Sequence, residues 1–157
     1  MGAAMSPFNA FMFIQGLETL HLRMKEHSAN GQKVAEHLSK HPMVERVAYP
    51  GVSSGLPKER ADKYLSNGCG GLLGFDIKGG HEAGKKFINS LEMLYHVANI
   101  GDSRSLAIHP ASTTHSQLNE EELASGGISP NYIRLSIGLE HIDDILADID
   151  QALSKAE

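Results

Sequence analysis

The chain has 157 residues, of which 41% are hydrophobic and 21% charged, and its formal net charge is −5. This length fits one domain that is large enough to bury a core. Basic and acidic residues are interspersed, so no row of cations is available to neutralise phosphates, and nucleic-acid binding is disfavoured. No apolar run approaches the roughly 20 residues that span a bilayer. The single cysteine, Cys69, excludes an intrachain disulfide. We therefore expect one cytoplasmic domain without a membrane partner.

The first segment, up to His41, has the apolar spacing of a helix that begins at the N-cap Ser6, with Pro7 in its first turn. At 1.5 Å per residue such a helix would be about 50 Å long, which exceeds the width of a domain of this size. Gly16 and Gly31 each weaken it, so we expect a bend or break. Its first half, which includes Phe8, Phe11 and Met12, is too apolar to face water. That half therefore indicates a partner surface.

Roughly five short strands, interspersed with helices, are predicted in the remainder of the chain. Strands are assigned where apolar residues alternate or cluster between Gly and Pro turns, and helices where they recur at helical spacing. The expected strands are 44–49, 70–77, 95–98, 105–108 and 132–137, and the expected helices are 57–65, 81–94, 119–125 and 141–154. Together they predict an α+β fold, in which the long N-terminal helix leads into a small antiparallel sheet that is covered by helices on one face.

The last predicted strand carries an arginine on its polar face. A period of two places Ile133 and Leu135 on one face, and Arg134 and Ser136 on the other. A guanidinium in a sheet needs an anionic partner, and its planar fork matches a carboxylate through two hydrogen bonds. The partner of Arg134 is either one of the chain's own acidic residues or the carboxylate of a substrate.

A polar segment, residues 97–118, lies between two short apolar runs. It is either a surface connection between strands or a binding surface that the flanking strands hold in place. Asn99 at its start could hold the second oxygen of a carboxylate, or it could be a turn residue ahead of Gly101.

The sequence offers no assignable metal ligands or catalytic residues. Two histidine pairs, His109 with His115 and His37 with His41, lack the third and fourth ligands of a zinc site. We expect these histidines to face solvent or to cap helices. Spacing singles out no Ser–His–Asp or paired-carboxylate arrangement.

Six blocks in order along the chain carry a resemblance to a known family. They are SPFNAF at 6–11, GLETLHLRM at 16–24, VAYPG at 47–51, GGLLGF at 70–75, SLAIHPASTTH at 105–115 and IRLSIGLEHIDDI at 133–145. They resemble the C-terminal part of the Cys/Met-metabolism family of pyridoxal-phosphate (PLP) enzymes, which have fold type I and are cystathionine γ-synthase-like. Within that family, ANIGDSRSL at 98–106 with HPASTTHSQL at 109–118 most resembles the O-acetylhomoserine sulfhydrylase group. Cystathionine lyases and methionine γ-lyase usually carry serine where Asn99 stands.

The resemblance implies roles for three residues in binding an amino-acid substrate. Arg134 matches the arginine that binds the α-carboxylate, Asn99 occupies the position that assists it, and Thr114 matches a threonine that lines the substrate side of the pocket. The family's Schiff-base lysine lies in an S-x-T-K-like motif upstream of the matching region, and none of the nine lysines here has that context. The cofactor PLP would therefore be held by a missing N-terminal domain.

The resemblance further implies how the chain is organised and used. Residues 1–41 would form an inter-domain helix and residues 42–157 a C-terminal substrate-binding domain of a truncated, homo-oligomeric enzyme of methionine biosynthesis. The whole enzyme would exchange the acetate of O-acetylhomoserine for sulfide or a thiol, giving homocysteine or methionine, with PLP as electron sink. This chain alone would be inactive. The alternatives are a stand-alone amino-acid-binding or assembly module, or the same domain of a cystathionine γ-synthase or lyase or of a methionine γ-lyase.

Overall fold

The computed structural model describes residues 4–157, so the first three residues of the predicted inter-domain helix lie outside the described part. The elements in chain order are α1 (Pro7–Glu18), α2 (Leu20–Leu38), β1 (Val44–Ala48), η1 (Pro50–Val52), α3 (Leu56–Tyr64), β2 (Leu72–Ile77), α4 (Gly80–Ser90), β3 (Tyr95–His96), β4 (Leu106–Ile108), η2 (Pro110–Ser112), α5 (Glu120–Ser125), β5 (Tyr132–Ser136) and α6 (Ile142–Lys155). Within this range every helix is too short or too polar to cross a lipid bilayer.

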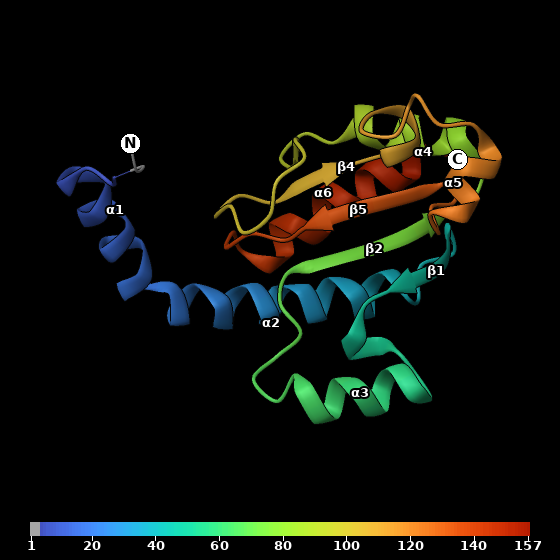
Figure 1. Ribbon diagram of the computed structural model, residues 1–157. Helices are drawn as coiled ribbons and strands as arrows, with labels where there is room; N and C mark the ends of the chain where they lie inside the picture. The colour runs from blue at the N-terminus through green and yellow to red at the C-terminus, as the bar shows by residue number, and fades with distance from the viewer. Residues whose placement is uncertain (1–3) are drawn as a thin grey trace.

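The five strands form one sheet in the order β1-β2-β5-β4-β3, with β5 at its centre (Figure 1). The pairs β1–β2, β2–β5 and β4–β5 are antiparallel, whereas the two-residue β3 runs parallel to β4. The predicted α+β fold is confirmed, but the sheet is mixed at this edge and not wholly antiparallel. The reason is the connection 97–105, which carries the chain back to the end of the sheet from which β3 started.

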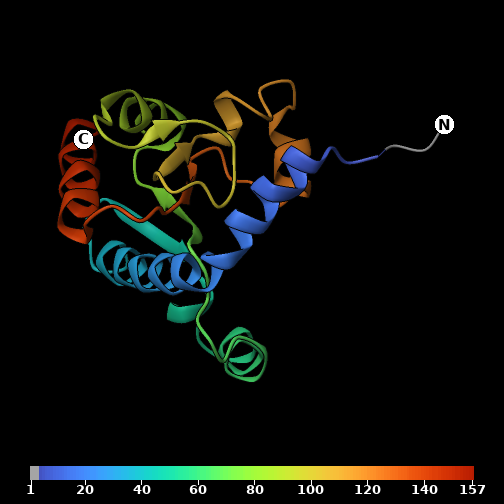
Figure 2. The same ribbon diagram turned by 90° about the vertical axis from the view of Figure 1, so that its left-hand side faces the viewer.

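Helices cover one face of the sheet. Figures 1 and 2 show α2, α4 and α6 gathered on one side of the strands, while α1 projects away from the sheet on the other side. The sheet residues that point toward these helices are fully or almost fully buried, and they are Leu73, Phe75, Ile77, Ile133, Leu135 and Ile137. The core therefore lies between β2, β5 and the three helices, and no helix of this layer covers the opposite face.

The long first helix is broken at Thr19, whose backbone is not helical (φ −104°, ψ 1°). The break lies three residues after Gly16, so one of the two glycines at which a bend or break was expected is close to the observed break. Gly31 is not a weak point: it is buried inside α2, and a Cβ there would lie 2.6 Å from the carbonyl oxygen of Gly70. This glycine allows α2 to approach the backbone at the start of β2.

The predicted strands and helices are found with small differences at their ends. The largest concerns α4, which ends at Ser90 although its apolar pattern continues to Leu94. The backbone N–H groups of Glu92, Met93 and Leu94 donate to the carboxylate of Asp148 instead of continuing the helix. A contact from a distant helix therefore ends α4 early.

Candidate functional site

Arg134 lies in the middle of the central strand. It is opposite Gly74 of β2 on one side and opposite Ile108 of β4 on the other. Its neighbours Ile133 and Leu135 are fully buried against the helices, so the half-buried Arg134 side chain lies on the face that those helices leave open. The predicted alternation along this strand is confirmed.

The Arg134 guanidinium contacts Asn99. Its Nη2 donates a hydrogen bond to the backbone carbonyl oxygen of Asn99 at 3.3 Å. Among the described carboxylates, none lies within 4.0 Å of Arg134. The internal salt bridge considered for this arginine is therefore not formed by those residues. The guanidinium keeps further N–H donors for an external anion.

Arg134 and Asn99 line the same shallow hollow on the open face of the sheet. Its lining consists of Val97, Asn99, Leu106, Ile108, Arg134 and Ser136. The side-chain oxygen of Asn99 accepts a hydrogen bond from the backbone N–H of Ile100 at 2.8 Å, which leaves its amide nitrogen as a donor. The apolar walls lower the local dielectric, and hydrogen bonds to a bound anion are stronger there than in water. The hollow is too shallow to enclose a molecule, so the donors of Arg134 and Asn99 face the open side of the sheet.

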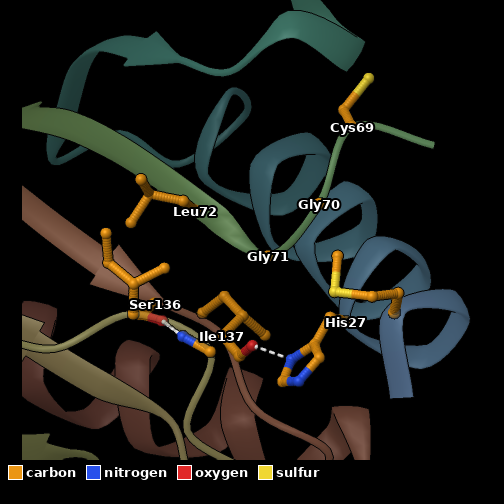
Figure 3. A pocket seen from close by; sticks show the side chains of 10 residues that line it. His27, Cys69, Gly70, Gly71, Leu72, Ser136 and Ile137 are labelled. Carbon is orange, nitrogen blue, oxygen red and sulfur yellow. Dashed lines mark hydrogen bonds between the residues drawn. The ribbon is translucent and has the colours of Figure 1, made fainter. Parts of the chain in front are cut away.

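Ser136 is a member of this site to which the sequence analysis assigned no role. Its Oγ accepts a hydrogen bond from the backbone N–H of Gly101 at 3.4 Å, which attaches the segment that carries Asn99 to β5 (Figure 3). The signal was present in the sequence, because the period of two places Ser136 on the same face as Arg134. Ser136 also borders a neighbouring cavity of about 180 Å³, whose other labelled walls in Figure 3 are His27, Cys69, Gly70, Gly71, Leu72 and Ile137.

Thr114 is not brought into the hollow. It is exposed in the turn after η2, and its hydroxyl hydrogen-bonds to Nδ1 of His115 at 2.8 Å. Of the three residues proposed to bind substrate, the structure thus places Arg134 and Asn99 together and leaves Thr114 apart.

A second arginine in the same region is already paired. Arg104 donates to both carboxylate oxygens of Asp102, at 3.2 and 3.1 Å, and lies over the Tyr95 ring, 4.7 Å from its centroid. The hydrogen bonds from the Arg104 side chain and backbone lower the pKa of the Asp102 carboxyl. Unlike Arg134, this guanidinium is therefore not set up to receive an external anion.

The histidines differ in part from the expectation. His109 is fully buried and does not face solvent: its Nε2 donates to the carbonyl oxygen of Pro130 at 2.7 Å, and its Nδ1 bonds to the Ser112 hydroxyl at 2.8 Å. Burial lowers the pKa of His109 and thereby favours the neutral ring. His37 is half-buried and bonds to Asp150 at 2.6 Å. Across residues 4–157 no three His, Cys, Asp or Glu side chains are arranged to hold a metal ion.

The chain is thus an α+β domain whose sheet is covered by helices on one face and carries the Arg134 guanidinium on the other. The chain belongs to the Cys/Met metabolism PLP-dependent enzyme family, whose sequence model matches residues 1–154. The assignment from the six sequence blocks is confirmed.

Known relatives cover almost all of this chain. An O-acetyl-L-homoserine sulfhydrylase of Leptospira meyeri is 56% identical over 154 residues, which are 98% of this chain and 35% of that protein. An L-methionine gamma-lyase of Treponema denticola is 46% identical over 154 residues, which are 98% of this chain and 38% of that protein. The chain therefore spans little more than a third of the length of the curated relatives that it matches.

A solved structure shares the fold. It is a Campylobacter jejuni protein assigned as an O-acetylhomoserine (thiol)-lyase, and it contains N'-pyridoxyl-lysine-5'-monophosphate. It is 47% identical in sequence, with a TM-score of 0.89 over 98% of this chain and 36% of that one. The predicted fold of a C-terminal domain of fold type I is confirmed by this match.

The residues described here do not fit the PLP cofactor. Of the nine lysines, which all lie within residues 4–157, eight are exposed, Lys58 is half-buried, and none lines the hollow that contains Arg134. The described residues therefore place no amino group beside the Arg134 guanidinium to bond the carbonyl carbon of a cofactor.

Proposed function

We propose that this chain is the substrate-carboxylate-binding part of an O-acetylhomoserine sulfhydrylase-like PLP enzyme. In that enzyme O-acetylhomoserine and sulfide or a thiol give homocysteine or methionine and acetate. The observation that carries the proposal is the hollow on the open sheet face, in which Arg134 has an Asn99 contact and no described carboxylate partner. The names of the relatives in Leptospira and Campylobacter support the choice of reaction.

Arg134 and Asn99 would act by orientation. Two guanidinium N–H groups of Arg134 bind the two oxygens of the substrate α-carboxylate, and the Asn99 amide nitrogen donates to one of them. Holding this end of the amino acid reduces the rotational freedom that would otherwise be lost on the way to the transition state. Thr114, at the end of the same polar segment, would contact the more distant part of the substrate. Its exposed hydroxyl would exchange the hydrogen bond to Nδ1 of His115 for that contact.

The remaining parts of the enzyme would lie outside this chain. The cofactor, when bound there, supplies an electron sink. Residues 1–41 would form the inter-domain segment and residues 42–157 the binding domain, and the whole enzyme would be a homo-oligomer. The uncovered apolar side chains of α1 support a partner surface at this end of the chain. Without a cofactor-attachment lysine, this chain alone would have no activity.

A chimera tests the proposal. This chain would be joined to the N-terminal part of the Leptospira meyeri relative that precedes the matching region, and product formation from O-acetyl-L-homoserine and sulfide would be measured. We expect the chimera to form homocysteine and the isolated chain to form none. Arg134→Ala should raise KM for O-acetyl-L-homoserine about 100-fold, because two charge-assisted hydrogen bonds to the carboxylate are lost.

The matched control is Arg60→Ala, which removes an exposed guanidinium from α3, away from the hollow. It should leave KM unchanged. An Arg134→Ala chimera with an unaltered KM would contradict the proposed role of the hollow. Turnover of L-methionine in preference to O-acetyl-L-homoserine would favour the methionine γ-lyase alternative, to which the Treponema denticola relative points. Micromolar binding of a free amino acid by the isolated chain would favour a stand-alone binding module, whereas the substrate-binding part of a larger enzyme should bind it alone only weakly.

A further inference from the structure

Two buried side chains of α2 hold the backbone that directly follows the arginine strand. Asn30 is 1% exposed, and its Nδ2 donates to the carbonyl oxygens of Gly138 at 3.2 Å and Glu140 at 3.1 Å. One turn earlier, the buried His27 bonds through Nδ1 to the carbonyl oxygen of Ile137 at 2.7 Å (Figure 3). Since all these acceptors are carbonyls, the two side chains act as donors. Helix α2 thus fixes the turn at residues 137–140, more than 100 residues away in sequence.

The same turn is bonded to the segment that carries Asn99. The backbone N–H of Gly138 donates to the Ser105 hydroxyl at 2.9 Å, and the N–H of Leu139 donates to the Ser103 carbonyl at 2.8 Å. The Glu140 carboxylate accepts the Ser105 N–H at 2.6 Å and the Ser105 hydroxyl at 2.9 Å. The segment 97–105, which carries Asn99, therefore cannot shift relative to β5 without breaking several buried or half-buried hydrogen bonds.

Helix α2, the start of β2 and the turn 137–140 pack closely against one another. A Cβ on Gly138 would lie 2.4 Å from the Ser103 carbonyl oxygen and 2.4 Å from Oε2 of Glu140. A Cβ on Gly71, at the start of β2, would lie 2.7 Å from the Ile137 carbonyl oxygen and 3.3 Å from Cβ of His27. Because packing at such distances leaves no free volume, a displacement of α2 near His27 would also displace the turn at residues 137–140.

We propose that Asn30 is a positioning residue for the carboxylate site. From the inter-domain segment it fixes the turn 137–140, and through that turn it sets how Asn99 and Arg134 face each other across the hollow. Substrate affinity thereby depends on the position of α2 relative to the turn 137–140, although α2 itself does not contact the carboxylate. This inference rests on the proposed function, since it assigns Arg134 and Asn99 to the carboxylate.

The test compares Asn30→Ala with Val34→Ala in this chain. Val34 is also fully buried on α2, but its side chain makes no hydrogen bond, so its truncation destabilises the fold without releasing the turn. Hydrogen exchange of the backbone amides of Gly101, Ser105 and Leu139 would be measured relative to core amides of β2. NMR titration with O-acetyl-L-homoserine would give the affinity.

We expect Asn30→Ala to speed exchange at these three amides about tenfold more than Val34→Ala does, and to weaken amino-acid binding about tenfold relative to it. This is the size expected for the loss of a buried hydrogen bond. Equal exchange and equal affinity in the two variants would overturn the proposal.

Should Asn30→Ala fail to fold, Glu140→Ala tests the step from the turn to the Asn99 segment on which the role of Asn30 depends, because Glu140 is half-buried and its carboxylate holds Ser105. Faster exchange at Gly101 and Ser105 with weaker binding supports the positioning role, and unchanged values overturn it. A wild-type chain that shows no shift with O-acetyl-L-homoserine contradicts the carboxylate role proposed for the hollow. The exchange data still show whether Asn30 holds the loop.

Discussion

At the scale of single residues, one buried carboxylate directs the chain toward the candidate site. Asp148 of α6 accepts hydrogen bonds from the backbone N–H groups of Glu92, Met93 and Leu94 and from the side chain of Gln151, at 2.8 to 2.9 Å. Burial alone would raise the pKa of this carboxyl, but the four hydrogen bonds outweigh it and lower the pKa. The contact ends α4 and turns the chain into β3, from which the Asn99 segment leaves.

We predict that Asp148→Asn lowers the free energy of unfolding by about 2 kcal/mol at pH 7, because hydrogen bonds to a charged acceptor are lost. The folded-state pKa lies below the unfolded value near 4. The stabilisation is therefore present above that pH and is lost as the pH falls through the folded-state pKa. Denaturant titrations should show the difference between variant and wild type shrinking below about pH 4.

The exposed Asp144, in the first turn of α6, provides the control. Asp144→Asn should change the free energy of unfolding by less than about 1 kcal/mol. A difference for Asp148→Asn that stays constant into acid would contradict the assignment of its stabilisation to the ionised carboxylate.

At the scale of elements, two glycines within helices have opposite effects on stability. A Cβ on Gly16 in α1 would have no atom within 4 Å, whereas a Cβ on Gly31 in α2 would lie 2.6 Å from the Gly70 carbonyl oxygen and 3.2 Å from Cα of Gly71. The first glycine only weakens its helix. The second allows α2 to dock against the chain that enters β2, where the Asn30 contacts form.

We predict that the same substitution has opposite effects at these two positions. Gly16→Ala should increase helicity, with a local gain of up to about 1 kcal/mol, because alanine is the better helix former. Gly31→Ala should destabilise the fold by about 1 to 3 kcal/mol, since overpacking outweighs that gain. Circular dichroism and denaturant unfolding measure the two effects. A stabilised Gly31→Ala variant would contradict the close docking of α2.

At the scale of the whole molecule, helix α1 is left uncovered by the rest of residues 4–157. None of the residues of α1 is buried, and its large apolar side chains are more than half exposed, with Phe8 at 70% and Phe11 at 55%. Such a surface is typical of a contact with another polypeptide. In the proposed enzyme the rest of the longer chain covers it, so this chain alone should use it for self-association.

We predict that replacing Phe8 and Phe11 together with serine shifts the chain toward the 17.0 kDa monomer in sedimentation experiments. Burying a phenylalanine contributes about 1.5 to 3 kcal/mol, so two replacements should dissociate a weak complex. The control replaces two exposed apolar residues of α3, Leu56 and Tyr64, and should leave the mass unchanged. A wild-type chain that is monomeric at high concentration would contradict this use of α1.

The sequence by itself determined the elements and the face on which the candidate arginine lies. Turn residues and apolar periodicity act over a few residues, so they located the strands and helices and placed Arg134 opposite the core side of β5. The six sequence blocks determined the family, and the family indicated Arg134 with Asn99. Thr114 was assigned by the same resemblance, and its role stays a prediction.

Only the tertiary structure decided which distant groups meet. No spacing rule links Asn30 to Gly138, Asp148 to Leu94 or Gly31 to Gly70, because these contacts arise when separate elements pack and their buried polar groups find partners. The same cause explains the early end of α4, the parallel pairing of β3 and the burial of His109. Local pattern sets what each segment can form, whereas packing decides which of its groups are satisfied and by which partner.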